Sequence, residues 1–596
     1  MIINRLLAIL DQIAKESLHG IWVSGRKQCK FALMQPIIEC VPNFSEGRNP
    51  AIIKEITDAI EAVEGVTLLD VDPGKATNRT VVTFVGHPDA VIEAAYLGIK
   101  RAAELIDMRN HSGEHPRMGA TDVCPLIPIS GITMEETAEY AKKLGKRVGE
   151  TLNIPVYLYE AAQSNKERSN LSVIRAGEYE GFAEKIKMAE WKPDFGKAEL
   201  NITAGATVIG ARDFLIAYNV NLNTKSTRIA NRIAFDVREA GRVKREGNPY
   251  SGKIMNDENG EPIRIPGKLK HVKAIGWFIE EYNMAQISMN LTNYKETPLH
   301  IAFEETRKSA DERGVRVTGS ELVGLIPLQA MLDAGRYFLE KQGLSIGVSE
   351  ADLVDCAIRT LGLNELGEFN PNKKIIEYLL KDPKQTRLVD MTVTKFANET
   401  ASDSPAPGGG SVAAVAGALG AALGTMVANL SASKRGWEDR VAEFSPWAEK
   451  GQKLKDRLLF LVDEDTRAFD GIMNAFGLPK DTPEQVKARK AAIQEASKYA
   501  TLTPYQTMEA AFACVEMLEE MADKGNPNSL SDVGVGVLCI KTAVRGAWLN
   551  VIINAQGLDD KEWAQDIVTK AKAILEKNHP ACDRIVEKIE NRLMGN

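Results

Sequence analysis

The chain has 596 residues, 44% of them hydrophobic and 26% charged, which is typical of a globular protein and excludes general disorder. Its formal net charge of -7 provides no basic surface for a polyanion, so we expect no nucleic-acid partner. The seven cysteines contain no CxxC pair, which argues against a zinc ribbon or a disulfide framework and favours a reducing, cytoplasmic location. At about 150 residues per domain, the length predicts three to four domains.

The first 35 residues hold a short apolar stretch, 6–10, which ends at Asp11. This stretch is too short for the core of a signal peptide, and no small-residue cleavage site follows it. One face of an amphipathic helix would contain Ile2, Ile3, Leu6, Leu7, Leu10 and Ile13. We therefore treat residues 1–35 as an N-terminal extension, which would add a contact element to the fold.

Short β-rich runs alternate with amphipathic helix patterns from about residue 36 to residue 378. The runs predict strands at 37–41, 66–71, 80–85, 123–129, 156–159 and 285–290. Between them, Pro50 and Pro88 stand where a first helical turn tolerates proline, and Thr133 begins a capping box. Such alternation predicts helices layered on sheets, in two α/β subdomains (α+β sandwiches) that span 36–213 and 214–380.

A charged segment interrupts the second subdomain. Residues 253–255 and 263–265 flank a turn at Asn259 and Gly260, which predicts a β-hairpin insertion. The charge of this segment indicates that the hairpin faces solvent.

Strand signals nearly vanish after residue 390, apart from a short run at 533–538. The polar segment 381–388, which contains Pro383, is the predicted linker. Residues 389–596 are predicted to form an all-α helical domain.

Residues 412–430 carry no charge and are long enough to suggest a membrane span. Alanine and glycine dominate them, and such small residues let a helix approach its neighbours closely. Because charged helix patterns flank this stretch and no second apolar span is evident, we interpret it as a buried bundle helix. A single-pass membrane anchor is the weaker alternative.

The densest polar constellation is the heptapeptide 111–117, which contains two of the seven histidines. His111 and His115 are four residues apart, a spacing that zinc sites use on a helix, but a glycine and a proline between and beside them disfavour a helix. General acid–base catalysis by one histidine is the second hypothesis, because imidazole titrates near neutral pH. A structural loop histidine is the third. Spacing alone leaves catalysis and structure about equally open.

Arg109 precedes this heptapeptide and Arg117 is its last residue, and guanidinium groups can hold carboxylates through two parallel hydrogen bonds. Two further polar segments, 43–47 and 70–74, follow predicted strands. The ends of strands are where α/β sheets place ligands, although the Asp-Pro-Gly of the second segment is also an ordinary turn.

An acidic residue interrupts an apolar stripe in the helical domain. Six residues follow a 4-3-4-3-4 spacing that places them on one helix face: Leu454, Leu458, Leu461, Asp465, Ala468 and Ile472. A carboxylate in such a stripe is costly unless it is paired or functional, and burial should raise the pKa of Asp465. A buried structural aspartate is the alternative. Asp463 and Glu464 fall on other faces and are predicted to be solvated.

A glycine-rich loop, 407–411, precedes the charge-free helix. It lacks the Gly-Lys-Ser/Thr ending of a phosphate-binding P-loop. The unpaired N–H groups at the start of the helix would still favour an anion, and close helix packing is the other explanation for these glycines.

Several long motifs now point to a known family. Residues 39–47, 69–72, 77–80, 113–120 and 175–179 resemble glutamate formimidoyltransferase. Residues 406–414 resemble formimidoyltetrahydrofolate cyclodeaminase. In their order and in the lengths between them, the motifs resemble the fused formimidoyltransferase-cyclodeaminase family over nearly everything from residue 36 onward.

The resemblance implies two successive reactions. The family transfers the formimidoyl group from N-formimidoyl-L-glutamate to N5 of tetrahydrofolate and releases glutamate. The second domain then closes the ring, which gives 5,10-methenyltetrahydrofolate and ammonia. These reactions belong to histidine degradation and one-carbon metabolism. The implied co-substrate is tetrahydrofolate, in polyglutamylated form in family members, and no metal is implied.

The resemblance also implies an assembly and a location. Family members form homo-oligomers, commonly octamers built as rings of dimers. The expected partners are therefore small-molecule substrates and further copies of the chain, in the cytoplasm and without a membrane span.

The resemblance further assigns site residues. The catalytic histidine of the transferase falls on His115, and the active-site acid of the cyclodeaminase falls on Asp465. A second folate contact falls near Ala491. We add the hypothesis that Asp72 orients the imidazole or holds the cationic amidine of the substrate. The first folate-binding stretch consists of Gly196, Lys197, Ala198, Glu199, Leu200, Asn201, Ile202, Thr203, Ala204 and Gly205.

The interior of this folate-binding stretch, 197–204, differs from that of animal members, so the resemblance implies backbone contacts there rather than particular side chains. Family members begin close to Met34, and we therefore favour a misassigned start for the preceding residues. Two alternatives stay open: a chain with one activity, and a folate-binding or membrane-associated scaffold without turnover.

Overall fold

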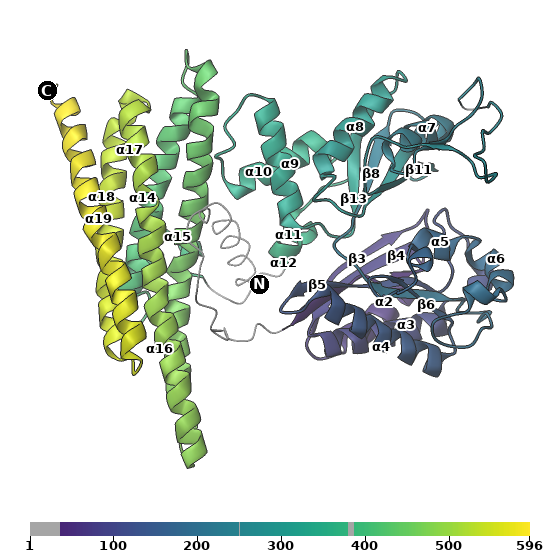
Figure 1. Cartoon of the computed structure of the whole chain (residues 1–596), viewed down its shortest axis with the longest axis horizontal. Helices are drawn as coiled ribbons and strands as arrows, with labels where there is room; N and C mark the ends of the chain where they lie inside the picture. The colour runs from purple at the N-terminus through teal and green to yellow at the C-terminus, as the bar shows by residue number, and fades with distance from the viewer. Residues whose placement is uncertain (1–35, 250, 380–386, 596) are drawn as a thin grey trace. The chain divides into compact units, whose positions relative to one another are not determined.

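A computed structural model describes residues 36–249, 251–379 and 387–595 (Figure 1). The chain folds into two compact units. The first contains the described residues up to 334 and 357–379, and the second contains 335–356 and 387–595. The N-terminal extension and most of the predicted linker lie outside the described residues. Sheets in the first unit and helices in the second confirm the predicted fold class.

The first sheet has seven strands. At one edge, β3 pairs antiparallel with β4. The next position is shared by β1 and β2, each of which pairs antiparallel with both β4 and β5. Beyond β5, the sheet continues with β7, which is parallel to β5, and then β6, which is parallel to β7. These strands are β1 (Ile37–Cys40), β2 (Asn43–Phe44), β3 (Val66–Gly74), β4 (Arg79–Gly86), β5 (Thr121–Ser130), β6 (Val156–Glu160) and β7 (Thr207–Ala211). The five strands predicted in this region are confirmed, but Asp70 and Asp72 lie within β3 rather than in a loop after it.

Three helices cover one face of this sheet (Figure 1): α2 (Pro50–Glu61), α3 (Pro88–Leu105) and α4 (Met134–Leu152). Both prolines occupy first-turn positions, and the capping box at Thr133 is formed, as predicted. Apolar side chains of the helices and strands form one core. On the other face, α5 (Leu171–Arg175) and α6 (Glu178–Lys185) contribute to a smaller core.

The second sheet is antiparallel, in the order β11-β12-β8-β13. Its strands and its two covering helices are β8 (Ile216–Leu222), β11 (Val272–Ile279), β12 (Met284–Leu291), β13 (Val317–Val323), α7 (Thr227–Val237) and α8 (Leu299–Asp311). Between α7 and β11 lies the charged insertion, where β9 (Arg242–Val243) pairs with β10 (Arg264–Ile265). Met255 O accepts from Ile263 N at 2.9 Å, so the predicted hairpin forms. Its second arm includes β10, which also pairs with β9.

Four further helices follow: α9 (Leu328–Lys341), α10 (Glu350–Leu361), α11 (Pro371–Lys374) and α12 (Ile376–Leu379). The end of α9 and the start of α10 belong to the second unit. There, Asn429 Nδ2 and Gln452 Nε2 donate to Gly347 O at 2.7 and 3.0 Å, and Ile346 N donates to Ser445 Oγ at 2.9 Å.

The rest of the second unit is a bundle of long helices (Figure 1): α13 (Val393–Thr400), α14 (Gly409–Ala432), α15 (Val441–Phe476), α16 (Pro483–Phe512), α17 (Val515–Lys524), α18 (Leu530–Gln556) and α19 (Lys561–Leu593). The strand signal at 533–538 was misleading, because these residues lie inside α18. Glycines allow close packing of α14 on α18, since a side chain at Gly420 would overlap Gly536 O.

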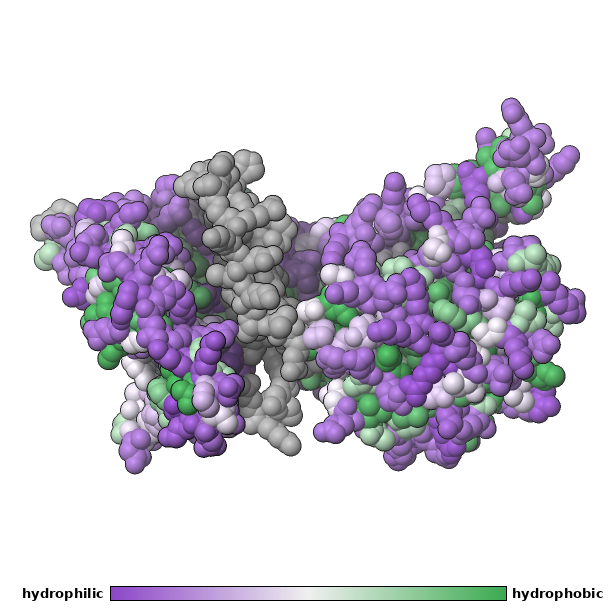
Figure 2. Space-filling view, turned by 60° about the horizontal axis from the view of Figure 1, so that its bottom comes forward, coloured by the Kyte–Doolittle hydropathy of each residue, from purple (hydrophilic) through white to green (hydrophobic). Residues whose placement is uncertain are grey.

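Two helical segments of the described chain are long and apolar enough to cross a membrane, Gly409–Ala432 and Pro527–Gln556. The sequence indicated only the first of them. α14 is a bundle helix, as expected, but it is only partly buried: other parts of the protein cover 61% of its apolar window, and Leu419 is 56% exposed. Figure 2 shows a face of the molecule on which hydrophilic side chains predominate and hydrophobic ones form small groups.

Candidate functional site

The loop that carries His115 lies between α3 and β5 and is tied to the ends of two other strands. Asn78, just before β4, donates from Nδ2 to Ser112 O at 2.9 Å and accepts from Gly47 N at 3.0 Å. Position 113 requires glycine, since a Cβ there would overlap Thr77 O. The loop is therefore fixed on the sheet by backbone contacts that need asparagine and glycine at these positions.

The imidazole of His115 contacts the protein through Nδ1. This atom lies 2.7 Å from Pro116 O, which can only accept, and 3.2 Å from Arg79 Nη1, which can only donate, and the shorter contact favours the tautomer with the proton on Nδ1. Nε2 consequently keeps its lone pair and has no partner among the described residues. Burial and the charges of Arg79 and Arg175 lower the pKa of His115 to about 3, so the imidazole is neutral at physiological pH. Nε2 can accept a proton, but a pKa this far below neutrality makes His115 a weaker base than the ordinary imidazole on which the prediction rested.

A buried carboxylate between two arginines adjoins this imidazole. Asp122 accepts from Arg79 Nη1 at 2.5 Å and from Arg175 Nη2 at 2.6 Å. Burial alone would raise the pKa of Asp122, but the two guanidinium groups lower it to about 2. Arg79 Nη1 is also 3.2 Å from Nδ1 of His115. The carboxylate nearest the imidazole is therefore Asp122, which the sequence did not identify.

The two arginines in and before the histidine heptapeptide are engaged elsewhere. Arg109 binds Asp107 at 2.6 Å, and Arg117 binds Glu178 and Glu180 at 3.0 and 2.6 Å. Both hold carboxylates, as predicted, but these belong to the protein itself. His111 has a structural role, with Nε2 2.9 Å from Asn78 O. No group of three side chains able to hold a metal occurs among the residues described.

Asp72 does not contact the imidazole. Its Oδ2 accepts from Gly324 N at 2.7 Å, after β13, and lies 3.7 Å from Lys374 Nζ. The structure thus brings Asp72 to the second sheet instead of to His115. Its contacts therefore do not support the hypothesis that Asp72 orients the imidazole. Its Oδ1 has no partner in the described part of the chain.

The expected folate-binding stretch packs directly against the histidine loop. Gly205 adopts a φ of +70° and pairs with Gly119, and a Cβ at Gly205 would overlap Met118 O. Asn201 Oδ1 accepts from Thr203 N and Ala204 N at 3.2 and 3.0 Å, which shapes the turn. The structure therefore brings 196–205 and the segment that follows His115 together, with 196–199 and 202–203 exposed.

Asp465 lies at the start of α14, although it belongs to α15. Its Oδ2 accepts from Ser411 N at 2.8 Å and from Ser411 Oγ at 3.1 Å. A Cβ at Gly410 would overlap the same carboxylate. Burial raises the pKa of Asp465 and the two Ser411 hydrogen bonds partly oppose it, which confirms the predicted direction. The anion at this helix start is thus a carboxylate of the protein.

Both neighbours of Asp465 were wrongly predicted to be solvated. Glu464 is only 3% exposed and binds Tyr499 Oη and Arg467. Asp463 accepts from Leu388 N at 2.6 Å, and burial raises its pKa. The prediction treated α15 as having one buried face, whereas its neighbours cover it on several sides.

Ala491 is not brought to Asp465. Tyr499 meets Glu464, and Arg489 Nη2 donates to Phe476 O at 2.9 Å, so α15 and α16 run antiparallel. In this register Ala491 is exposed and level with the last turns of α15. The two residues therefore lie at different heights along the helix pair.

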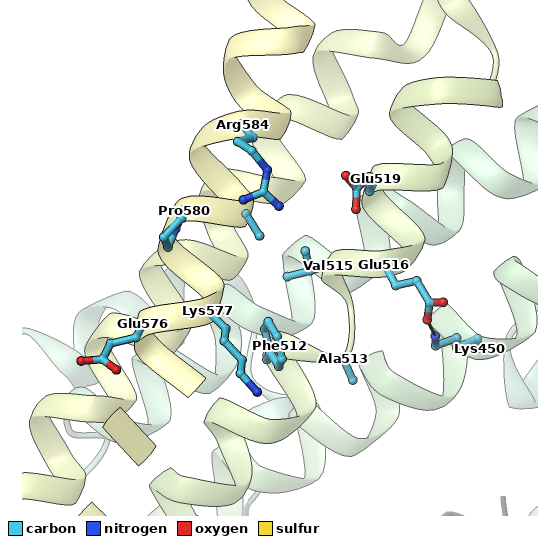
Figure 3. Close-up of a pocket in the computed structure, with 11 residues that line it drawn as sticks. Lys450, Phe512, Ala513, Val515, Glu516, Glu519, Glu576, Lys577, Pro580 and Arg584 are labelled. Carbon is cyan, nitrogen blue, oxygen red and sulfur yellow. Dashed lines mark hydrogen bonds and ion pairs between the residues drawn. The ribbon is translucent and has the colours of Figure 1, made fainter. Parts of the chain in front are cut away.

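A hollow of about 660 Å³ opens elsewhere in the second unit (Figure 3). Residues of α15, α16, α17 and α19 line it, with Phe512 and Pro580 between basic and acidic side chains. Lys450 and Glu516 form an ion pair of 2.5 Å at its edge. Neither Asp465 nor Ala491 lines this hollow.

Three family models match the chain: "Formiminotransferase domain, N-terminal subdomain" over 37–212, "Formiminotransferase domain" over 217–381, and "Formiminotransferase-cyclodeaminase" over 392–573. The formimidoyltransferase-cyclodeaminase of Rattus norvegicus is 42% identical over 561 residues, which cover 94% of this chain and all of that protein. The chain belongs to the formimidoyltransferase-cyclodeaminase family. This confirms the resemblance that the motifs indicated.

Single-function relatives match each half of this formimidoyltransferase-cyclodeaminase family member. Glutamate formimidoyltransferase of Thermoplasma acidophilum is 45% identical over 313 residues, which cover 52% of this chain and 95% of that protein. Methenyltetrahydrofolate cyclohydrolase of Methylorubrum extorquens is 39% identical over 202 residues, which cover 34% of this chain and 97% of that protein.

Four residues of these two sites were not identified from the sequence: Arg79, Asp122, Arg175 and Ser411. Three of them stand in or beside motifs that carried the resemblance, at 77–80, 175–179 and 406–414. Asp122 directly precedes a predicted strand, a position that gave no signal of its own. Only the folded chain shows that Arg79 and Arg175 meet on one carboxylate.

Proposed function

We propose that this chain is a bifunctional enzyme that transfers the formimidoyl group of N-formimidoyl-L-glutamate to N5 of tetrahydrofolate and then cyclises the product to 5,10-methenyltetrahydrofolate with release of ammonia. The single observation that supports it best is the pair of sites. A neutral imidazole with a free Nε2 stands beside the expected folate stretch, and a carboxylate with a raised pKa stands in a separate unit.

In the transfer step, His115 Nε2 takes the proton from N5 of tetrahydrofolate as N5 bonds to the formimidoyl carbon. The bond from that carbon to the glutamate nitrogen then breaks, and the imidazolium returns its proton to the leaving nitrogen. The half of the Asp72 hypothesis that its contacts leave open is an interaction of Oδ1 with the cationic amidine, and substitution tests it. Asp72→Asn should then lower turnover and leave folate binding unchanged. A rate equal to that of wild type would contradict the role.

In the cyclisation step, N10 bonds to the formimidoyl carbon and the former amidine nitrogen leaves as ammonia. Asp465 relays the proton from N10 to that nitrogen, since burial raises the pKa of its carboxyl group above the usual range and so makes the carboxylate a better proton acceptor. The exposed backbone of 196–205 and, more loosely, Ala491 would contact folate.

The name of the Methylorubrum relative suggests a second reaction for the helical unit, the hydrolysis of 5,10-methenyltetrahydrofolate. The two reactions are separated by one assay. A cyclohydrolase consumes added 5,10-methenyltetrahydrofolate, whereas a cyclodeaminase accumulates it from 5-formimidoyltetrahydrofolate.

We further propose that the chain forms a cytoplasmic homo-oligomer, in the form of the octameric ring of dimers that the resemblance implies. Two apolar surfaces of the helical unit support this assembly. One is the α14/α18 face, which comprises Val412, Leu419, Met426, Leu430, Val535, Leu538, Leu549 and Ile553. The other lies near the ends of α15 and α16, with Phe469, Met473, Phe476, Leu478 and Val486 exposed. A ring of dimers requires two kinds of contact.

The test is a coupled assay of the full chain with N-formimidoyl-L-glutamate and tetrahydrofolate. The proposal predicts equimolar glutamate and ammonia, together with the absorbance of 5,10-methenyltetrahydrofolate. Release of glutamate without ammonia would indicate that only the transferase is active. Tight folate binding without release of glutamate would indicate a scaffold. Polyglutamylated tetrahydrofolate should serve as substrate in the same assay.

His115→Ala should slow transfer at least ~10²-fold, because the proton acceptor is lost. Cyclisation of supplied 5-formimidoyltetrahydrofolate should continue at the wild-type rate. His271→Ala is the matched control, since His271 is a surface residue paired with Glu296 at 3.0 Å. Near-normal transfer by His115→Ala would refute the assignment.

A further inference from the structure

Two buried arginines beside His115 carry more positive charge than the protein neutralises. Arg79 and Arg175 share a single carboxylate, Asp122, and their side chains are 11% and 13% exposed. His115 next to them is neutral. The cluster therefore has an excess of one positive charge in a largely buried place, which favours the binding of one anionic group.

The hydrogen-bond donors of the two arginines are not all used. Arg79 donates from Nε to Asn43 Oδ1 at 2.9 Å and from Nη1 to Asp122. Arg175 donates from Nε and Nη2 to Asp122 at 3.2 and 2.6 Å. Arg79 Nη2 and Arg175 Nη1 have no partner among the described residues. Since neither atom is fully buried, both can be reached from solvent.

The two arginines lie beside the imidazole of His115. Arg79 approaches Nδ1 of His115 to 3.2 Å, and the expected folate stretch packs on the residues just after His115. Arg109 and Arg117, which the sequence suggested as carboxylate ligands, are occupied by acidic residues of the protein. Arg79 and Arg175 are thus the guanidinium groups with capacity left at this site.

We propose that Arg79 and Arg175 bind the α-carboxylate of N-formimidoyl-L-glutamate and so position its formimidoyl carbon beside His115. This inference rests on the proposed transferase reaction. The α-carboxylate is attached to the carbon that bears the reacting nitrogen, so a clamp on it restricts the reacting group most directly. Free donors on two guanidinium groups suit the two oxygens of a carboxylate.

Tetrahydrofolate also carries glutamate carboxylates, which have the same chemistry. They are separated from N5 by the length of the aminobenzoyl group. When N5 is at His115, those carboxylates cannot reach the same two arginines. The anion at the clamp therefore belongs to the formimidoyl donor.

The test compares Arg175→Lys with wild type in steady-state transfer assays. Lysine keeps the positive charge near His115 but loses the guanidinium fork. We expect KM for N-formimidoyl-L-glutamate to rise about tenfold, the equivalent of one hydrogen bond to a charged group, with KM for tetrahydrofolate changed less than about twofold. Arg109→Lys is the matched control, because Arg109 is an exposed arginine near the same loop that is occupied by Asp107.

A second probe is the α-amide of the donor, N-formimidoyl-L-isoglutamine. It lacks the negative charge of the α-carboxylate and keeps that of the γ-carboxylate. Wild type should prefer the acid to the amide, and Arg175→Lys should lose most of this preference. The circular dichroism spectrum and thermal unfolding of each variant report whether the first unit is folded.

Three results would overturn the inference: a rise in KM for tetrahydrofolate alone, an unchanged KM for both substrates, or an unchanged preference for the acid. Failure of the proposed function is a separate outcome, in which wild type transfers nothing. In that case titration with L-glutamate still decides the inference. Binding by wild type that weakens in Arg175→Lys supports the clamp, and binding that is absent or equal in both refutes it.

Discussion

Ser411 binds Asp465 through both its backbone and its side chain. The backbone N–H and the hydroxyl group meet the same oxygen, Oδ2, at 2.8 and 3.1 Å. Oδ1 is left without a described partner, so it is the oxygen available to carry a proton. Hydrogen bonds from Ser411 favour the ionised carboxylate, whereas burial favours the protonated one, and burial dominates.

Ser411→Ala should raise the pKa of Asp465 further, because one hydrogen bond to the ionised form disappears. The limb of the cyclisation pH profile that reports this carboxyl group should move to higher pH. Transfer should stay within about twofold of wild type, since His115 lies in the other unit. A pH profile that does not move would show that the hydroxyl group does not influence Asp465.

Residue-level predictions succeeded where a property is local. The capping box at Thr133 and the raised pKa of Asp465 need only neighbours on the same element or the fact of burial. Asp463 and Glu464 were misjudged, because one helix cannot indicate how many partners will surround it. Arg79 and Arg175 are 96 positions apart, and their meeting on Asp122 depends on the folded sheet.

At the level of elements, the start of α14 is shaped by what it must accommodate. Asp465 of α15 lies where a side chain at Gly410 would be, so glycine is required there by the neighbouring helix. Gly409 has a different environment. A Cβ at Gly409 would meet Asn550 Nδ2 at 3.7 Å, which is an ordinary contact.

Gly410→Ala should abolish or strongly reduce cyclisation, because the new methyl group displaces the carboxylate of Asp465. Gly409→Ala is the matched control and should retain cyclisation, as it introduces the same group one position earlier without overlap. Transfer should be unaffected in both. Equal cyclisation rates for the two variants would contradict the observed packing.

The α14/α18 face is continuous because of how its helices pair. Gly420 lies against Gly536, and Ala413 against Gly546, so the helices are antiparallel. Leu419 and Val535 each precede a contact residue by one position, which places them on the same side of the pair. The face is therefore suited to a second copy of the chain.

Leu419→Glu, at a side chain that is 56% exposed, should weaken self-association through this face, because each dimer would bury two new charges. The mass measured by sedimentation or light scattering should fall at low protein concentration. Val393→Glu is the control, since Val393 is 87% exposed and lies outside this face. A variant with the wild-type mass would place the interface elsewhere.

Strands were easier to predict than the limits of the packed units. Five strands of the first sheet follow from β-rich runs, which are local patterns. The run at 533–538 is also rich in valine but belongs to α18, where a long helical context overrides β-propensity. Residues 335–356 continue the second α/β subdomain in sequence and yet pack with the helical unit, which no local pattern reveals.

On the scale of the whole molecule, the two candidate sites share no residue. His115, Arg79 and Arg175 belong to the first unit, and Asp465 and Ser411 to the second. Each site has its own sheet or helix bundle for support, so damage to one should leave the other intact.

His115→Ala and Asp465→Asn should therefore complement each other. Alone, each variant fails to form 5,10-methenyltetrahydrofolate in the coupled assay. Mixed, they should form it, because the second variant makes 5-formimidoyltetrahydrofolate and the first cyclises it. A mixture with no product would show that the two reactions must occur in one chain.

Residues 335–356 leave the first unit and return to it, so the polypeptide passes between the units three times. Its excursion is held by Gly347, whose carbonyl accepts from Asn429 and Gln452. Proteolytic cleavage at 381–388 would therefore yield two fragments that remain associated through residues 335–356. A transferase half expressed alone would present the same segment to solvent without its cover.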